Sequence, residues 1–251
     1  MELLKLFLGF IACVVLAFKL PSILIFLLHL AQFIPWKLKD LFRFFHLKKK
    51  GVLPFRPYGL KMFCGRQGSG KTIGMVWYLE RLRKKYPDAL IYTNFGYEKE
   101  TAPLESLLDL LRFRNGEKGV IFAIDELQNE FSSSVSKNFP ETLLSEITQQ
   151  RKQKITILST SQVFSRVAKP LREQCYEVIE CRTFGGRWTR LKCYDASDYC
   201  TILDSTSPDK KFKLPKKWSQ SFIQSDRLRE MYDTYAKIVR LSRHGFKDTG
   251  S

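Results

Sequence analysis

The chain has 251 residues, which is enough for one sizeable core domain with attachments. Its formal net charge of +17 indicates an anionic partner, either a nucleic acid or an anionic lipid surface. The six cysteines form no C-x-x-C pair, so their spacing argues against a zinc site and favours reduced, partly buried thiols.

The N-terminal segment is apolar from Leu6 to Trp36. As one helix it would be about 46 Å long, and the hydrocarbon core of a bilayer is about 30 Å thick. Lys19 and Pro21 interrupt the run. Two arrangements fit: a single span over Leu20–Trp36 preceded by an interfacial helix, or a membrane hairpin that turns at residues 19–22. A cleaved signal peptide is disfavoured because the basic region before the apolar run is weak.

The basic residues near this segment lie almost all on its C-terminal side. They are Lys37, Lys39, Arg43, Lys48, Lys49 and Lys50, and only Lys5 precedes the run. This asymmetry predicts that everything after the span lies in the cytoplasm. Leucine and phenylalanine alternate with these bases, which suits either an interfacial helix or a solvated charge run. We expect residues 1–36 to anchor the chain in the membrane, and residues 37–57 to be a basic juxtamembrane segment and linker.

A glycine-rich loop, GRQGSGKT, occupies Gly65–Thr72 between a predicted strand at Tyr58–Cys64 and a predicted helix at Thr72–Tyr86. This context is the one that the phosphate-binding P-loop requires, and it argues against a merely flexible Gly-Ser loop. We expect Lys71 to bridge the β- and γ-phosphates of ATP, and the Thr72 hydroxyl to bind Mg²⁺. The predicted nucleotide-binding residues are Gly65, Arg66, Gln67, Gly68, Ser69, Gly70, Lys71 and Thr72.

Further along the chain we expect a strand at Ala89–Asn94, a helix at Pro103–Phe113 and a buried strand that begins at Gly119. This buried strand ends in Asp125 and Glu126, about 55 residues after the P-loop, which is the spacing of an NTPase acidic pair. Asp125 is predicted to hold Mg²⁺ through water, and Glu126 to polarise the attacking water.

A fourth strand is predicted at Ile155–Gln162. In P-loop ATPases of the additional-strand class this strand lies between the P-loop strand and the acidic-pair strand. Thr160, Ser161 and Gln162 would then face the γ-phosphate, with Gln162 as a candidate catalytic residue. Ordinary capping of the strand end by Ser and Thr is the alternative.

A helix at residues 141–151 ends in Arg151, which we consider as an arginine finger that acts across a subunit boundary. Arg166 and Arg172 compete for this role, and a solvated basic face is the alternative for each.

The last predicted strands, Cys175–Cys181 and Arg187–Asp195, are joined by a turn at residues 185–186. A basic linker at residues 209–217 then leads to a helix at Asp226–Ser242. The predicted fold is α/β, a RecA-like P-loop NTPase with a mostly parallel sheet over residues 58–200. Residues 201–251 would form the basic linker and the C-terminal helix.

In order along the chain stand GRQGSGKT, YTN, IDE, QQRKQKITILSTSQ, REQCYEVIECR and YDTYAK. Over residues 58–236 this series resembles the zonular occludens toxin-like domain family, the assembly ATPases of filamentous bacteriophages. The strand end Thr-Ser-Gln is also similar to DNA translocases of the FtsK/HerA group. The resemblance implies ATP and Mg²⁺ as cofactors, a homo-oligomeric ring, and viral DNA and coat or assembly proteins as partners. It also implies location at the host inner membrane.

One departure from the family is the position of the anchor, which precedes the ATPase domain here and follows it in the assembly ATPases that can be compared. The expected function is a membrane-anchored phage or prophage ATPase that drives virion extrusion or DNA movement. A genome-packaging or conjugative DNA translocase is the first alternative. A toxin-like interaction protein without enzymatic activity is the second.

Overall fold

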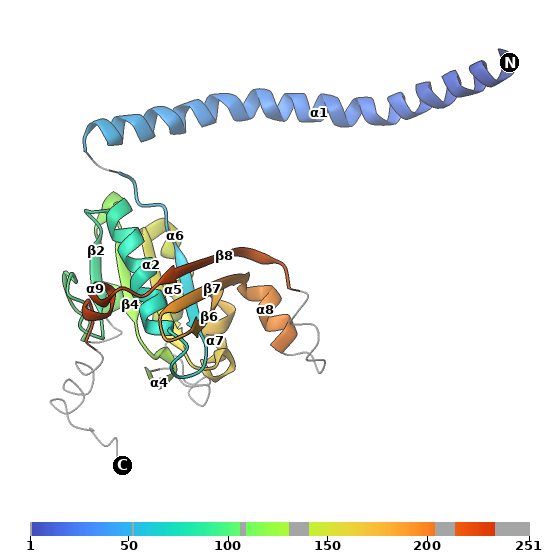
Figure 1. Ribbon diagram of the computed structural model, residues 1–251. Coiled ribbons are helices and arrows are strands. Elements are labelled where there is room, and N and C mark those ends of the chain that lie inside the picture. Colours follow the sequence, from blue (N-terminus) through green and yellow to red (C-terminus); the bar gives the residue numbers. More distant parts are fainter. Residues whose placement is uncertain (1, 52, 106–108, 131–140, 204–213, 234–251) are drawn as a thin grey trace. The chain divides into compact units, whose positions relative to one another are not determined.

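The computed structural model describes residues 2–51, 53–105, 109–130, 141–203 and 214–233. The chain divides into two compact units, residues 1–53 and 54–251 (Figure 1). The boundary between Leu53 and Pro54 falls inside the segment that the sequence predicted as a linker.

The first unit is one helix, α1 (Glu2–Lys49), with Pro21 and Pro35 inside it. Of the two arrangements considered for this segment, the hairpin with a turn at residues 19–22 is therefore wrong, and the juxtamembrane segment continues the same helix. Because a helix satisfies its own backbone groups, a proline within it costs one hydrogen bond, whereas a turn in an apolar run would leave several groups unpaired. The stretch Lys19–Lys49 is long and apolar enough to cross a membrane. Its large side chains are exposed, including Phe26 at 64% and Trp36 at 67%.

The described part of the second unit is built on an eight-stranded sheet with the strand order β3-β2-β4-β5-β1-β6-β7-β8. Neighbours from β3 to β6 pair in parallel, and β6, β7 and β8 pair antiparallel. The strands are β1 (Gly59–Cys64), β2 (Leu90–Thr93), β3 (Ala102–Pro103), β4 (Val120–Ile124), β5 (Ile155–Ser161), β6 (Cys175–Phe184), β7 (Trp188–Asp195) and β8 (Lys216–Ile223). The predicted insertion of β5 between the P-loop strand and the acidic-pair strand is confirmed.

Where this unit is described, its helices are short apart from the one that follows the P-loop. They are α2 (Lys71–Lys85), α3 (Asp109–Arg112), α4 (Leu127–Glu130), α5 (Glu141–Thr148), α6 (Gln150–Gln153), α7 (Lys169–Glu173), α8 (Ala196–Leu203) and α9 (Asp226–Glu230), with 3-10 turns η1 (Gly116–Lys118) and η3 (Phe164–Arg166). Helix α5 and helix α6 replace the single helix expected at residues 141–151. Helix α3 covers only the end of the one expected at residues 103–113, and residues 106–108 lie outside the described part.

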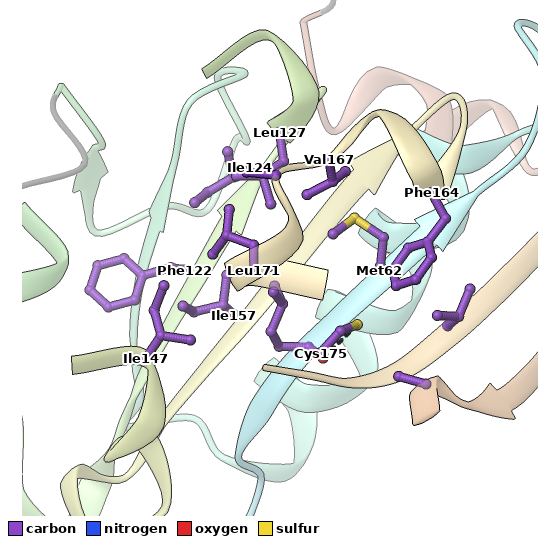
Figure 2. Packing of buried hydrophobic residues seen from close by; sticks show 14 of the residues in the cluster. Met62, Phe122, Ile124, Leu127, Ile147, Ile157, Phe164, Val167, Leu171 and Cys175 are labelled. Carbon is purple, nitrogen blue, oxygen red and sulfur yellow. Dashed lines mark hydrogen bonds between the residues drawn. The ribbon is translucent and has the colours of Figure 1, made fainter. Parts of the chain in front are cut away.

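Apolar side chains project from both faces of the parallel strands, and their burial forms the core. On one face, Met62 of β1, Phe122 of β4 and Ile157 of β5 join a buried cluster with Ile147 of α5 and Leu171 of α7 (Figure 2). On the other face, β1 directs Phe63 at Tyr78 of α2, with the ring centroids 5.9 Å apart. The parallel part of the sheet is therefore buried between helices on both faces.

The eighth strand was not predicted. Strand β8 lies where the sequence indicated a linker, and it pairs antiparallel with β7. Its aromatic residues Trp218 and Phe222 stack on Tyr78 and Trp77 of α2, at centroid distances of 6.3 and 4.7 Å. The predicted end of the ATPase domain at residue 200 is therefore wrong. The polar residues between these aromatics resemble a linker, and only pairing with β7 makes the segment a strand. Helix α9 begins at the predicted Asp226 but ends at Glu230, so the predicted course to Ser242 is wrong for residues 231–233, and residues 234–242 lie outside the described part.

Removal of residues 1–53 is expected to leave a soluble protein with a single cooperative thermal transition, because the sheet and its helices all lie after residue 54. Circular dichroism of the shortened chain measures this. A broad, non-cooperative melt would show that the first unit contributes to the core of the second.

Candidate nucleotide-binding site

The loop of the predicted nucleotide site runs from the end of β1 to the start of α2. It closes on itself through the Ser69 N–H, which donates to the Arg66 carbonyl at 3.1 Å. Gly68 and Gly70 have φ of 74° and 83°, a region that favours glycine. A Cβ on Gly70 would lie 2.4 Å from Thr183 Oγ1, whereas one on Gly68 would meet nothing within 4 Å. The loop is thus packed on one side and open at Gly68.

Two features of this loop favour a bound anion. The first turn of α2 contains no acidic residue, and its N-cap Gly70 supplies no side-chain cap, so backbone N–H groups and the positive helix end are left for a ligand. Lys71 is only 8% exposed. Within the described residues its ammonium forms no ion pair, and it donates to the Arg66 carbonyl at 3.2 Å. A buried ammonium is costly without compensating negative charge, and a bound phosphate would supply that charge.

The acidic pair lies directly beside this loop. Asp125 follows the last residue of β4, and its Oδ1 accepts hydrogen bonds from Thr72 Oγ1 at 3.0 Å and Thr160 Oγ1 at 2.7 Å. The Asn94 side chain holds the Asp125 backbone from both sides, accepting from its N–H at 2.7 Å and donating to its carbonyl at 3.2 Å. Four segments that are distant in sequence therefore meet at Asp125, two of them at its carboxylate and one at its backbone.

Glu126 adopts φ of 52°, an uncommon conformation for a residue with a side chain. Its N–H donates to Thr160 Oγ1 at 2.8 Å, and its Oε2 accepts from Asn129 Nδ2 at 2.8 Å. These two bonds hold the glutamate at the same edge of the sheet as the P-loop.

The polar end of β5 differs from the prediction. The Thr160 hydroxyl bonds to Asp125 and Glu126, and the Ser161 hydroxyl donates to the Val163 carbonyl at 2.9 Å. Both side chains are fully buried. Neither therefore faces an open phosphate site, although the sequence analysis expected that they would. Gln162 follows the strand at this edge and is partly exposed, and its catalytic role stays a prediction.

The donor set suits Mg²⁺. Thr72 and Asp125 present a hydroxyl and a carboxylate oxygen at one point, and hard oxygen ligands supplemented by phosphates and waters are those that Mg²⁺ prefers. Within the described residues, no group of three or more His, Cys, Asp or Glu side chains could hold a metal ion alone.

The cysteines that the structure describes are free thiols and are mostly buried, as the sequence indicated. Burial raises the pKa of the Cys193 thiol to about 12, so this thiol is protonated.

The three candidate arginines lie at different places. Arg151 precedes β5 at the sheet edge opposite the P-loop, with its guanidinium 5.5 Å from the Tyr58 ring centroid. Arg172 lies in α7, which leads into β6 at that same opposite edge. Arg166 follows β5 and is exposed at the P-loop edge. Arg151 is therefore too distant to reach the P-loop of its own subunit.

A partly buried series of hydrogen bonds behind the P-loop escaped the sequence analysis. The Thr183 hydroxyl donates to the Ser69 carbonyl at 3.0 Å and lies 2.9 Å from the Thr189 hydroxyl. Gln224 Nε2 donates to Thr189 Oγ1 at 2.7 Å, and Gln224 Oε1 accepts from the Arg229 guanidinium at 2.8 and 3.0 Å. These hydrogen bonds connect the P-loop to β6, β7 and the segment after β8. No motif marks this series, because its members are polar residues scattered over more than 100 positions.

Strand order, P-loop and acidic pair together define a P-loop NTPase fold of the additional-strand class. No protein-family model and no curated protein matches the sequence. Among solved structures, the N-terminal domain of zonular occludens toxin from Neisseria meningitidis matches with a TM-score of 0.50 and 18% identity, over 70% of this chain and 99% of that one. The resemblance expected from the sequence motifs is thus confirmed at the level of the fold.

Two further structures fit less closely. The genome packaging NTPase B204 from Sulfolobus turreted icosahedral virus 2, in complex with AMP, has a TM-score of 0.42 and 10% identity over 56% of this chain and 94% of that one. The pCW3 conjugation coupling protein TcpA with ATPγS has a TM-score of 0.36 and 17% identity over 51% of this chain and 50% of that one.

Replacement Thr183→Val is expected to weaken ATPγS binding about two- to tenfold, because a hydrogen bond that supports the P-loop backbone is worth about 0.5–1.5 kcal/mol. Titration calorimetry measures the affinity. Thr201→Val removes a hydroxyl from an exposed position of α8 and serves as the matched control. Equal affinity in both variants would show that the hydrogen bonds behind the loop do not position it.

Proposed function

We propose that this protein is a membrane-anchored ATPase that couples Mg-ATP hydrolysis to assembly or extrusion of a filamentous phage virion, or to movement of its DNA. The observation that carries the enzymatic part is the carboxylate of Asp125 beside Thr72, together with buried Lys71, whose ammonium forms no ion pair with any described residue. The fold of the zonular occludens toxin domain and the motif order support the biological part.

In this mechanism, Lys71 and the N–H groups of the loop bind the β- and γ-phosphates. Thr72 and Asp125 would hold Mg²⁺, which would supply positive charge to neutralise those phosphates. Glu126 orients the attacking water and accepts its proton. The Glu126 N–H bond to Thr160 and the side-chain bond from Asn129 keep the carboxylate in one place for that step.

Helix α1 supplies the proposed attachment. Its stretch from Lys19 to Lys49 has the length and the apolar composition for a span, and basic residues gather toward its C-terminal end. Such residues remain on the cytoplasmic side and contact anionic headgroups. We infer that the ATPase unit acts at the cytoplasmic face of the host inner membrane.

A ring of identical subunits is part of the proposal. Because Arg151 lies at the sheet edge away from its own P-loop, a finger at this position could serve only a neighbouring subunit. Viral DNA and phage coat or assembly proteins are the proposed partners. A DNA translocase would use the same site, and it differs in having duplex DNA as its track.

The full chain in detergent is expected to hydrolyse ATP in the presence of Mg²⁺, and Lys71→Ala to abolish both hydrolysis and tight ATP binding. Glu126→Gln is expected to retain ATP but nearly stop turnover, because the amide cannot accept a proton. Asp125→Asn should instead raise the Mg²⁺ concentration that hydrolysis requires.

Phosphate release and nucleotide binding, measured with and without single- or double-stranded DNA, check these outcomes. Wild-type turnover in Lys71→Ala would refute the site, and stimulation by duplex alone would favour the translocase.

Arg151→Ala is expected to bind ATP normally and to hydrolyse it about 10³–10⁵ times more slowly, as a finger in trans predicts. Mixing it with Lys71→Ala subunits should restore activity, since one variant supplies the site and the other the finger. The ATPase rate of mixed assemblies measures this. A defect without rescue would direct attention to Arg166 or Arg172.

A further inference from the structure

The antiparallel strands β6, β7 and β8 present an exposed face on the side away from α2. In register across the strands, Phe184, Trp188 and Ile223 form one row, and these side chains are 40, 54 and 65% exposed. The adjacent row begins with Arg182 opposite Arg190, both exposed. We call these five residues the hairpin face.

Packing among the described residues does not explain the hairpin face. On the opposite side of the same strands, Trp218 and Phe222 are stacked on aromatic rings of α2, whereas Trp188 projects into solvent. Two arginines directly opposite one another on paired strands repel and destabilise the sheet. Within the described residues neither arginine forms an ion pair, so the repulsion is not relieved there.

The rings of the face are also arranged so that they can take a ligand. Phe184 and Trp188 lie with centroids 6.1 Å apart and planes inclined by 54°, so they do not stack on each other and leave aromatic surface exposed. The Arg182 guanidinium lies 4.9 Å from the Phe184 centroid, which keeps a cation next to that ring. Aromatic surface flanked by guanidinium groups on an open sheet matches a polymer of planar bases joined by phosphates.

We propose that the hairpin face binds single-stranded nucleic acid, with bases stacked on Trp188 and Phe184 and phosphates paired with Arg182 and Arg190. Stacking requires bases that are free of a duplex, which selects the single-stranded form. The chain's net charge of +17 favours the same partner. This inference rests on the proposed function in one respect, which is that the ATPase acts on nucleic acid.

The position of the face connects it to the nucleotide site. Residues alternate sides along a strand, so Thr183, between Arg182 and Phe184, points to the opposite side. There its hydroxyl donates to the Ser69 carbonyl of the P-loop at 3.0 Å. The nucleic-acid surface and the support of the P-loop are therefore two sides of the same strand.

Binding is measured by fluorescence anisotropy of a labelled oligo-thymidine of about 20 nucleotides, with the full chain in zwitterionic nanodiscs and no nucleotide present. Trp188→Ala is expected to weaken binding about five- to 150-fold without changing its salt dependence, and Trp188→Phe to restore it. The double variant Arg182→Gln/Arg190→Gln should lower the slope of log affinity against log salt by about 1.4. Arg112→Gln, which removes an exposed arginine from α3, is the matched control and should bind as the wild type does.

Four results would overturn the proposal. The first is that Trp188→Ala binds the oligonucleotide as tightly as the wild type, and the second is that a matched duplex competes equally well. The third is that Trp188→Ala loses self-association and keeps its oligonucleotide affinity. The fourth is that Trp188→Ala loses only its pelleting with phosphatidylglycerol vesicles. The third would make the face a contact between copies, and the fourth a lipid surface. Oligonucleotide binding without ATP hydrolysis would refute the proposed ATPase but not the face. Hydrolysis without oligonucleotide binding would refute only the face.

Discussion

The Asp125 carboxylate is the point on which the organisation of the site depends. One of its oxygens accepts from Thr72 of the P-loop and from Thr160 of β5, and Asn94, directly after β2, holds its backbone. These contacts are possible because β5 lies between β1 and β4 and all of these strands run in parallel, so their carboxyl ends meet at one edge. A charged oxygen held among neutral hydroxyls is also a ready ligand for a cation.

The antiparallel part of the sheet supports the other half of the site. Strand β6 extends beside β1 and brings Thr183 to the P-loop, where it bonds the Ser69 carbonyl and leaves no room for a side chain at Gly70. Thr189 and Gln224 continue this contact into β7 and the segment after β8. The three strands therefore hold the loop from one side and present the hairpin face on the other, which gives a short physical route between them.

The two units expose different kinds of apolar surface, and each of these surfaces lies near basic residues. The long helix of the first unit exposes apolar side chains that a membrane would cover, and bases gather toward its end. In the described part of the second unit the apolar residues are mostly buried, and the two most exposed large ones, Trp188 and Ile223, lie in the hairpin face with Arg182 and Arg190. An anionic lipid surface and an anionic polymer would thus be met by different parts of one basic protein, and the two contacts need not compete.

The sequence by itself determined the features that depend on neighbouring residues. The P-loop, the acidic pair after a buried strand, and most strands of the sheet follow from local order and periodicity, and the order of β5 followed from the class of fold. Tertiary structure alone decided the roles of Asn94, Thr160 and Thr183, the identity of β8 and the continuity of α1 through Pro21. A polar side chain has no periodic signature, and its function depends on which distant backbone group it reaches. An edge strand with polar residues between its aromatics becomes a strand only when a neighbour supplies its hydrogen bonds.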